Sequence, residues 1–202
     1  MQQQQHVYDR RFEDGLNNAE ALFAERGFHA ASMRDIARAA RISVAGLYYY
    51  LPSKQAALYF VCNRVFDRLE AAARELPSCG DPRRRLETFV RGHLRHMIEN
   101  RDAYRVLLHD MKALEGDLRS KLRVRRRHYF SLASDLVSRL ETKNEVVPPR
   151  LAVAALFGML NWAPMWYQRE LDGDSDDLAD NMLALFLRGI SEPAPSAEEA
   201  RA

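Results

Sequence analysis

Residues 32–54 constrain the fold more than any other stretch of the chain. Two short apolar patterns lie close together here, and a serine precedes each of them: Ser32 comes before Ile36, and Ser43 comes before Leu47. A serine in that position caps the N-terminus of a helix. The second serine leaves a corner of about three residues between the two helices. The spacing therefore predicts a helix-turn-helix, with a further helix packed in front of it.

The rest of the chain also has apolar residues at helical spacing, and no stretch alternates as a strand would. We therefore expect an all-α protein. It would consist of a three-helix helix-turn-helix domain over residues 8–54 and a larger helical domain over residues 55–191. The remainder, residues 192–202, is rich in Pro, Ala and Glu, and we expect it to be a disordered tail.

Composition indicates a globular protein, since 47% of the 202 residues are hydrophobic and 29% are charged. Two cysteines cannot build a disulfide framework, and the glutamine-rich N-terminus, Met1 to Arg11, has no apolar stretch. We therefore expect a cytoplasmic protein without a secretory signal.

Charge is unevenly distributed along the chain although the net charge is only +2. Residues 83–127 contain fourteen Lys and Arg against six Asp and Glu, whereas residues 170–202 contain nine acids against two basic residues. This segregation indicates an anionic partner for the middle of the chain. The alternative is a solvated basic face that pairs with the acidic end of the same chain.

Residues 151–168 contain no charged side chain, and eighteen residues are close to the shortest membrane-spanning helix. Asn161 and Pro164 interrupt the stretch, and many of its residues are small. The pattern favours a buried helix or a helix at a subunit interface, and we expect no membrane contact.

The helix-turn-helix has features that suit DNA. Residues 28–54 carry four basic residues against one acid, which is the right sign for a phosphate backbone. Small residues, Ser43 to Gly46, would let the start of the second helix enter a major groove, and tyrosine hydroxyls beyond them would reach phosphates.

The stretch from Ala19 to Lys54 resembles the DNA-binding domain of the TetR family of bacterial repressors. The resemblance lies in Ala-x-x-Leu-Phe-x-x-x-Gly-Phe from residue 19, in Ile36-Ala37, in Leu-Tyr-Tyr-Tyr and in Ser-Lys. It implies that Tyr48, Tyr49 and Lys54 touch phosphate and that Val44 to Gly46 face base edges. The full set of DNA contacts that it implies is Arg34, Ser43, Val44, Ala45, Gly46, Tyr48, Tyr49, Tyr50 and Lys54.

Two details of this region add expectations. Three consecutive helical residues point in three directions, and we expect Tyr50 to be the most buried of the tyrosines. Arg41 stands where the family usually has glycine, so it would either strain the backbone at a positive φ or add a phosphate contact.

A palindromic operator requires two copies of the helix-turn-helix domain, residues 8–54, which we call the reading head; the two lie about one helical turn of DNA apart. The resemblance implies a homodimer formed by the last two helices, near 150–170 and 175–190, and a small-molecule effector among the middle helices. Apolar and adaptable residues that would line the effector site are Phe89, His93, Met97, Tyr104, Leu108, Met111, Phe130, Met159, Trp162 and Trp166.

The segment Gly158 to Trp162, with the later Trp166-Tyr167, resembles the corresponding region of TetR-family regulators that respond to acyl-CoA thioesters. This resemblance implies that the acyl chain lies among the aromatic residues. The arginines at 83–85, 123 and 125–127 would then hold the phosphates of coenzyme A.

Catalytic motifs are missing from the sequence, and we expect neither an enzyme nor a cofactor. His93, His96 and Glu99 share a helix face, but without a thiolate they favour a pocket lining over a metal site. The sequence thus predicts a ligand-responsive transcriptional regulator, a repressor released from DNA by its effector, and leaves open a regulator that activates instead. The alternative is a helical small-molecule-binding protein or an enzyme in which the helix-turn-helix is only structural.

Overall fold

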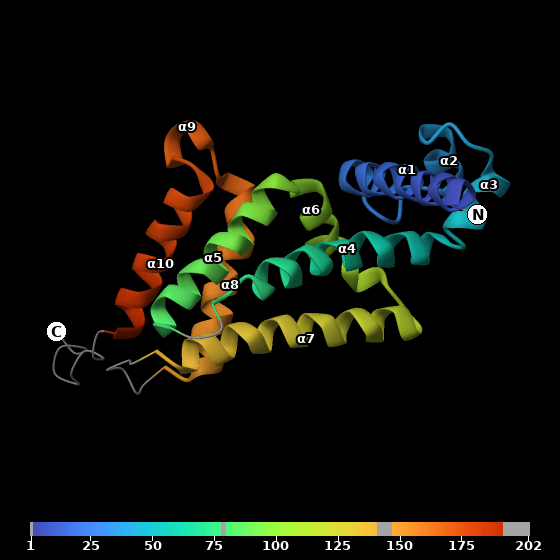
Figure 1. Ribbon diagram of the computed structural model, residues 1–202. Coiled ribbons are helices and arrows are strands. Elements are labelled where there is room, and N and C mark those ends of the chain that lie inside the picture. The colour runs from blue at the N-terminus through green and yellow to red at the C-terminus, as the bar shows by residue number, and fades with distance from the viewer. Residues whose placement is uncertain (1, 78–79, 141–146, 192–202) are drawn as a thin grey trace. The chain divides into compact units, whose positions relative to one another are not determined.

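The structure is a computed structural model that describes residues 2–77, 80–140 and 147–191. Every regular element in these ranges is helical and no strand occurs in them (Figure 1), which confirms the all-α prediction. The tail predicted over residues 192–202 lies outside the described residues. The helices are α1 (Gln2–Arg26), α2 (Met33–Ala39), α3 (Val44–Tyr50), α4 (Lys54–Arg74), α5 (Pro82–Glu99), α6 (Arg101–Asp110), η1 (Met111–Ala113), α7 (Gly116–Ser138), α8 (Pro149–Trp166), α9 (Arg169–Asp172) and α10 (Ser175–Ser191).

The first three helices begin and end at the residues that the sequence marks. Gly27 ends α1 with a φ of 79°. The hydroxyl of Ser32 accepts the amide of Asp35, and the Asp35 carboxylate accepts the amide of Ser32 at 3.1 Å, which is a capping box. Ser43 caps α3 by accepting the amide of Gly46 at 3.0 Å. These caps allow two helices of only seven residues each to keep defined ends.

The corner between α2 and α3 is fixed by side chains that solvent does not reach. Leu47 of α3 and Ile36 of α2 are 0% exposed, and Phe23 of α1 is 1% exposed. Gly15 of α1 makes room for Leu47, since a Cβ there would lie only 3.2 Å from Leu47 Cδ1. Burial of each large side chain contributes about 1.5–3 kcal/mol, so the inner face of α3 is set by packing.

The chain divides into two compact units, and α4 and α7 pass through both. One unit extends to Arg68 and also contains Asn100–Arg127, and here α1 packs on α6. The other contains Leu69–Glu99 and the described residues from His128 onward, and here α5 packs on α10 and α8. The helix-turn-helix therefore shares its unit with α6 and the first part of α7. The functional boundary at residue 54 stays a prediction.

Arg64 of α4 links this helix to α1 inside the first unit. Its guanidinium donates to Asn17 at 2.7 Å, to Glu13 at 3.1 Å and also to Glu20. Only 16% of the Arg64 side chain is exposed, and its three partners follow one another along α1. These three contacts attach α1 to α4 over about two turns of α1.

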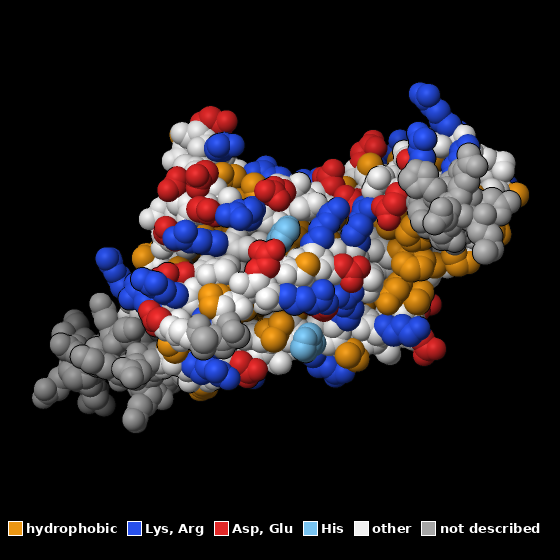
Figure 2. All heavy atoms as spheres, viewed as in Figure 1, with side chains coloured by type: hydrophobic (Ala, Val, Ile, Leu, Met, Phe, Trp, Pro, Cys, Tyr) orange, Lys and Arg blue, Asp and Glu red, His pale blue; other side chains and the backbone are white. Residues whose placement is uncertain are grey.

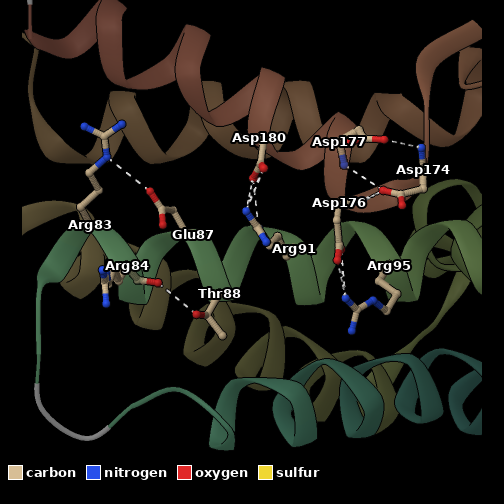
Figure 3. A network of polar contacts seen from close by, with 10 residues as sticks. All are labelled: Arg83, Arg84, Glu87, Thr88, Arg91, Arg95, Asp174, Asp176, Asp177 and Asp180. Carbon is tan, nitrogen blue, oxygen red and sulfur yellow. Dashed lines mark hydrogen bonds and ion pairs between the residues drawn. The ribbon is translucent and has the colours of Figure 1, made fainter.

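Arginines of α5 pair with aspartates of α10 in the second unit (Figure 3). Arg91 holds both carboxylate oxygens of Asp180 at 2.6 and 2.8 Å, and Arg95 holds those of Asp176 at 2.9 Å. Figure 2 shows basic and acidic side chains interleaved over these two helices. These arginines and aspartates therefore pair within the chain, which is the alternative that the sequence left open. Such exposed pairs contribute only about 0.2–1 kcal/mol each.

The uncharged stretch of the sequence forms α8, which ends at Trp166, and Tyr167 and Gln168 separate it from the single turn of α9. The helix expected over 150–170 is therefore shorter than predicted. None of the helices in the described ranges combines the length and the apolar character needed to cross a membrane.

Candidate nucleic-acid interface and effector site

The outer face of α3 carries small side chains at its leading end. Ser43 and Ala45 are exposed, and Val44 is 37% exposed, while Leu47 on the opposite face is buried. A Cβ on Gly46 would lie 3.0 Å from the capping hydroxyl of Ser43, so a side chain there would press on the cap. The leading turn thus presents backbone and small groups to solvent, as entry into a major groove requires.

The three tyrosines of α3 differ in burial in the predicted order. Tyr49 is 72% exposed and Tyr48 is 46% exposed, whereas Tyr50 is half-buried. The rings of Tyr49 and Tyr50 meet edge to face, with centroids 5.1 Å apart. The expectation that Tyr50 is the most buried of the three is confirmed, and the two other rings extend into solvent beside the leading turn.

Basic residues lie on α2 and in the turn that follows it. Arg34 and Arg41 are exposed, and Arg38 approaches Asp35 at 3.4 Å. The hydrogen bond from the Ser32 hydroxyl holds the pKa of Asp35 below its ordinary value. Arg41 has a φ of 55°, which is the strained backbone of the first of the two alternatives left open at this position. A left-handed conformation costs a non-glycine residue about 1–2 kcal/mol.

Lys54, at the start of α4, reaches back to the loop between α1 and α2. Its ammonium donates to the carbonyl oxygens of His29 at 3.2 Å and Ala31 at 2.8 Å, and it lies 4.4 Å from the centroid of the Phe28 ring. The side chain is half-buried. Lys54 therefore fastens this loop to α4, a contact that the sequence did not indicate.

An aromatic cluster in the second unit brings together three of the residues predicted to line an effector site. Phe89 and His93 of α5 stack on Tyr129 of α7 at centroid distances of 5.1 and 5.8 Å. Phe157 of α8 contacts His93 at 5.5 Å and stacks on Phe130 at 5.6 Å. Phe89, His93 and Phe130 thus belong to one cluster, whose other rings are Tyr129 and Phe157.

His93 is the polar centre of this cluster and, within the described residues, the one polar or charged residue that is buried. Its Nε2 lies 3.3 Å from Asn161 Oδ1, which can only accept, so Nε2 carries the proton. The other nitrogen, Nδ1, then accepts the hydroxyl proton of Tyr129 at 3.1 Å. Burial lowers the pKa of His93 to about 4, and the neighbouring His96 acts in the same direction. Burial also raises the pKa of Tyr129.

The other predicted effector residues are distributed over both units. Trp162 is 61% exposed and Trp166 is 42% exposed, so both indoles face outward. The second unit contains Met97, Met159, Trp162 and Trp166, and the first contains Tyr104, Leu108 and Met111.

Sequence reasoning missed three members of the cluster, Tyr129, Phe157 and Asn161, as candidates for an effector site. The pattern of apolar residues singled out neither Tyr129 nor Phe157, and Asn161 appeared only as an interruption of an apolar stretch. An amide within an apolar helix was the available signal, since such a group needs a hydrogen-bonding partner when it is buried.

The described residues include no group of three or more His, Cys, Asp or Glu side chains that could hold a metal ion. His93 in particular points both ring nitrogens at Tyr129 and Asn161, so it does not combine with His96 and Glu99.

Family models match most of the chain. Residues 16–58 match the model described as bacterial regulatory proteins, tetR family, and residues 79–190 match the tetracyclin repressor-like C-terminal domain. The first match contains the helix-turn-helix, and the second contains the aromatic cluster.

Individual relatives extend over nearly the whole chain. The transcriptional activator FasR of Mycolicibacterium smegmatis is 25% identical over 91% of this chain and 84% of its own. The transcriptional repressor KstR2 of Rhodococcus jostii is 27% identical over 88% and 90%. The crystal structure of PfmR from Thermus thermophilus is 28% identical, with a TM-score of 0.77 over 88% of this chain and 99% of its own. AibR in complex with isovaleryl coenzyme A and operator DNA, at 23% identity over 88% and 98%, has the same fold with a TM-score of 0.78. The chain therefore belongs to the TetR family of bacterial regulatory proteins, which are DNA-binding transcriptional regulators.

Proposed function

We propose that the protein is a homodimeric repressor that binds a palindromic operator through α3 of each protomer and leaves it when an effector binds. The observation that carries the proposal is the outer face of α3, exposed and small at its leading end while Leu47 anchors its inner face. Val44, Ala45 and Gly46 would face base edges, and the remaining contacts would be made by Arg34, Ser43, Tyr48, Tyr49, Tyr50 and Lys54.

Lys54 can serve DNA as well as the fold. An ammonium group has three N–H donors, and the carbonyls of His29 and Ala31 use two of them. The third would meet a phosphate oxygen beside the start of α4. This role belongs to the proposal, whereas the two carbonyl contacts belong to the structure.

The operator is tested by selecting duplexes from a random library with the purified protein. We expect an enriched palindrome, two protomers bound per site, and an affinity that falls steeply with salt. Enrichment of no sequence, together with binding that does not depend on salt, would contradict DNA recognition. That result would favour the alternative, a helical small-molecule-binding protein or an enzyme without DNA binding.

We place the effector in the second unit, at the aromatic cluster around His93. An apolar body suits the rings of Phe89, Phe130 and Phe157. AibR, which shares the fold, binds isovaleryl coenzyme A, and an acyl-CoA is the effector class that we propose.

Arg84 and Arg85 line a hollow of about 480 Å³ together with Pro77, Gly80 and Asp81, and this hollow would suit the phosphates of coenzyme A. Arg125 is already bonded to Asp67 and Asn63.

The operator complex also tests the effector. Short and long acyl-CoAs are titrated into it, and we expect at least one chain length to release the duplex. A shift from about 99% DNA-bound to about 99% DNA-free protein requires the effector to bind the DNA-free state more tightly by about 5.5 kcal/mol. Tighter DNA binding would indicate an activator, the activity that FasR's name records for that relative. Neither release nor heat in isothermal titration would remove the acyl-CoA proposal and leave DNA binding intact.

The dimer would form through α8 and α10, where large apolar side chains are exposed. Trp162, Met165 and Trp166 of α8 are 42–61% exposed, and Leu185 of α10 is 67% exposed. Both helices belong to the second unit and contact each other. Large exposed apolar side chains on two helices in contact are typical of an interaction surface.

Leu185→Arg is expected to convert the dimer to monomers, because it places a charge in the proposed apolar interface. Operator affinity should then fall about a hundredfold, since each head binds alone. Val124→Arg is the matched control, because Val124 is 55% exposed on α7 in the other unit. Sedimentation analysis gives the oligomeric state. A dimer that survives Leu185→Arg, with the control unchanged, would place the interface elsewhere.

A regulator of this kind performs no chemistry, so we propose that the chain is not an enzyme. Its relatives FasR and KstR2 are named as transcriptional regulators. Operator binding also requires access to the chromosome, and we therefore propose that the protein is cytoplasmic.

A further inference from the structure

The helix-turn-helix is held at both of its ends by one short segment far along the chain, residues 110–115, which we call the strap. The backbone amide of Phe28, just before α2, donates to the carboxylate of Asp110 at 3.1 Å. Residue 28 and residue 110 both belong to the first unit. This bond fixes the point at which the chain enters the helix-turn-helix.

Gln55 makes the corresponding contact just after the helix-turn-helix. Its Nε2 donates to the carbonyl of Ala113 at 2.9 Å, and its Oε1 accepts the amide of Glu115 at 3.3 Å. One side-chain amide thus pairs with two backbone groups of the strap. Residues 28 and 55 enclose the whole motif, so the strap contacts it on both sides.

The position of Asp110 shows that its carboxylate is committed to this contact. It is the last residue of α6, where the negative end of the helix dipole disfavours an acid. It also precedes η1 but makes no side-chain cap hydrogen bond there. The carboxylate of Asp110 therefore accepts the Phe28 amide and neither caps η1 nor stabilises the end of α6.

The strap is itself well anchored. Leu114 is 0% exposed within it, and α6, which leads into it, packs on α1. The two contacts with the motif therefore start from a fixed base. Loss of either one would leave the entry or the exit of the motif without its partner, while the core around Leu47 stayed intact.

We propose that Asp110 and Gln55 are positioning residues that set the direction in which α3 is presented to DNA, without touching DNA themselves. The inference rests on the proposed function for its DNA readout and goes beyond it, because the proposed contacts all lie within residues 34–54. The strap determines how well α3 fits its specific site, and leaves the number of phosphate contacts unchanged.

The test compares Asp110→Ala and Gln55→Ala with the wild-type protein on the selected operator and on an unrelated duplex. We expect each variant to lose about tenfold in operator affinity, with unchanged affinity for the unrelated duplex and an unchanged salt slope. Asp110→Asn keeps an acceptor oxygen and should recover most of the loss. Asp102→Ala is the matched control, since it removes an exposed acid from the same helix.

A second measurement does not depend on DNA. Hydrogen exchange at the amide of Phe28 and along α2 and α3 should become about tenfold faster in both variants, and stay unchanged in Asp102→Ala. Unchanged exchange in both variants would overturn the inference, whether or not the wild type binds an operator. A wild-type protein that bound no operator would by itself remove only the proposed function. Equal operator affinities for Asp110→Ala and Asp102→Ala would overturn it as well, as would a variant that lost only thermal stability.

Discussion

Leu47→Ala is expected to destabilise the reading head by about 2–5 kcal/mol, because it opens a cavity under a helix of only seven residues. Leu47 is 0% exposed and packs against Gly15 of α1. A domain is stable by only about 5–15 kcal/mol in total, so this single change removes a large part of the stability of the head. Operator binding should be lost with it.

Tyr49→Ala tests the exposed outer face of α3, as Leu47→Ala tests its buried inner face. Tyr49 is 72% exposed and its ring contacts that of Tyr50, so its loss should change stability by no more than about 1 kcal/mol. If Tyr49 contacts phosphate as proposed, operator affinity falls although the head stays folded, and the salt slope of binding is retained because no charge is removed.

Urea unfolding followed by circular dichroism, together with operator titration, measures both variants. Leu47→Ala should unfold at lower urea with an unchanged slope, and Tyr49→Ala should follow the wild type. Equal stability of the two variants would mean that α3 is not oriented as described. A Tyr49→Ala protein with full operator affinity would remove Tyr49 from the interface and leave the fold unaffected.

Local features of the head were predictable because their causes lie within a few residues. Ser32 and Ser43 cap amides three residues further along, and Gly27 adopts a positive φ where α1 ends. The exposure of Tyr48 and Tyr49 follows from the helical period once Leu47 is assigned to the core. Such features need no knowledge of the rest of the chain.

Contacts between distant segments could not be derived in this way. The excess of arginine at 83–127 left a partner and internal pairing equally open, and only the structure brings Arg91 to Asp180, 89 residues away. Asp110 and Phe28 are 82 residues apart, and neither residue type indicates the other. Asn161 was likewise visible only as an exception to a pattern.

His93 gives the protein a pH dependence whose direction follows from its burial. Its pKa is about 4 in the folded protein, against an ordinary value of about 6.5. Between these values the unfolded chain binds a proton at His93 and the folded protein does not. Stability therefore falls as the pH is lowered from about 6.5 to about 4, by about 3 kcal/mol in all, and the dependence levels off below.

His93→Gln isolates this contribution, because glutamine keeps an N–H donor but does not titrate. Carboxylates such as Asp35 and Asp174, whose pKa values are lowered by hydrogen bonds, titrate in both proteins and cancel in the comparison. Relative to the variant, the wild type should lose about 3 kcal/mol of unfolding free energy between pH 7 and pH 4.

Tyr129→Phe is the control for the cluster itself. It removes the hydroxyl that the neutral ring accepts at Nδ1, at 3.1 Å, but leaves the histidine buried, so the variant should be less stable near pH 7 and keep most of the wild-type dependence. Unfolding curves in urea at half-unit pH steps decide the matter. Parallel stability profiles for the wild type and His93→Gln would show that His93 titrates normally in the folded protein, and therefore that the aromatic cluster is open to water.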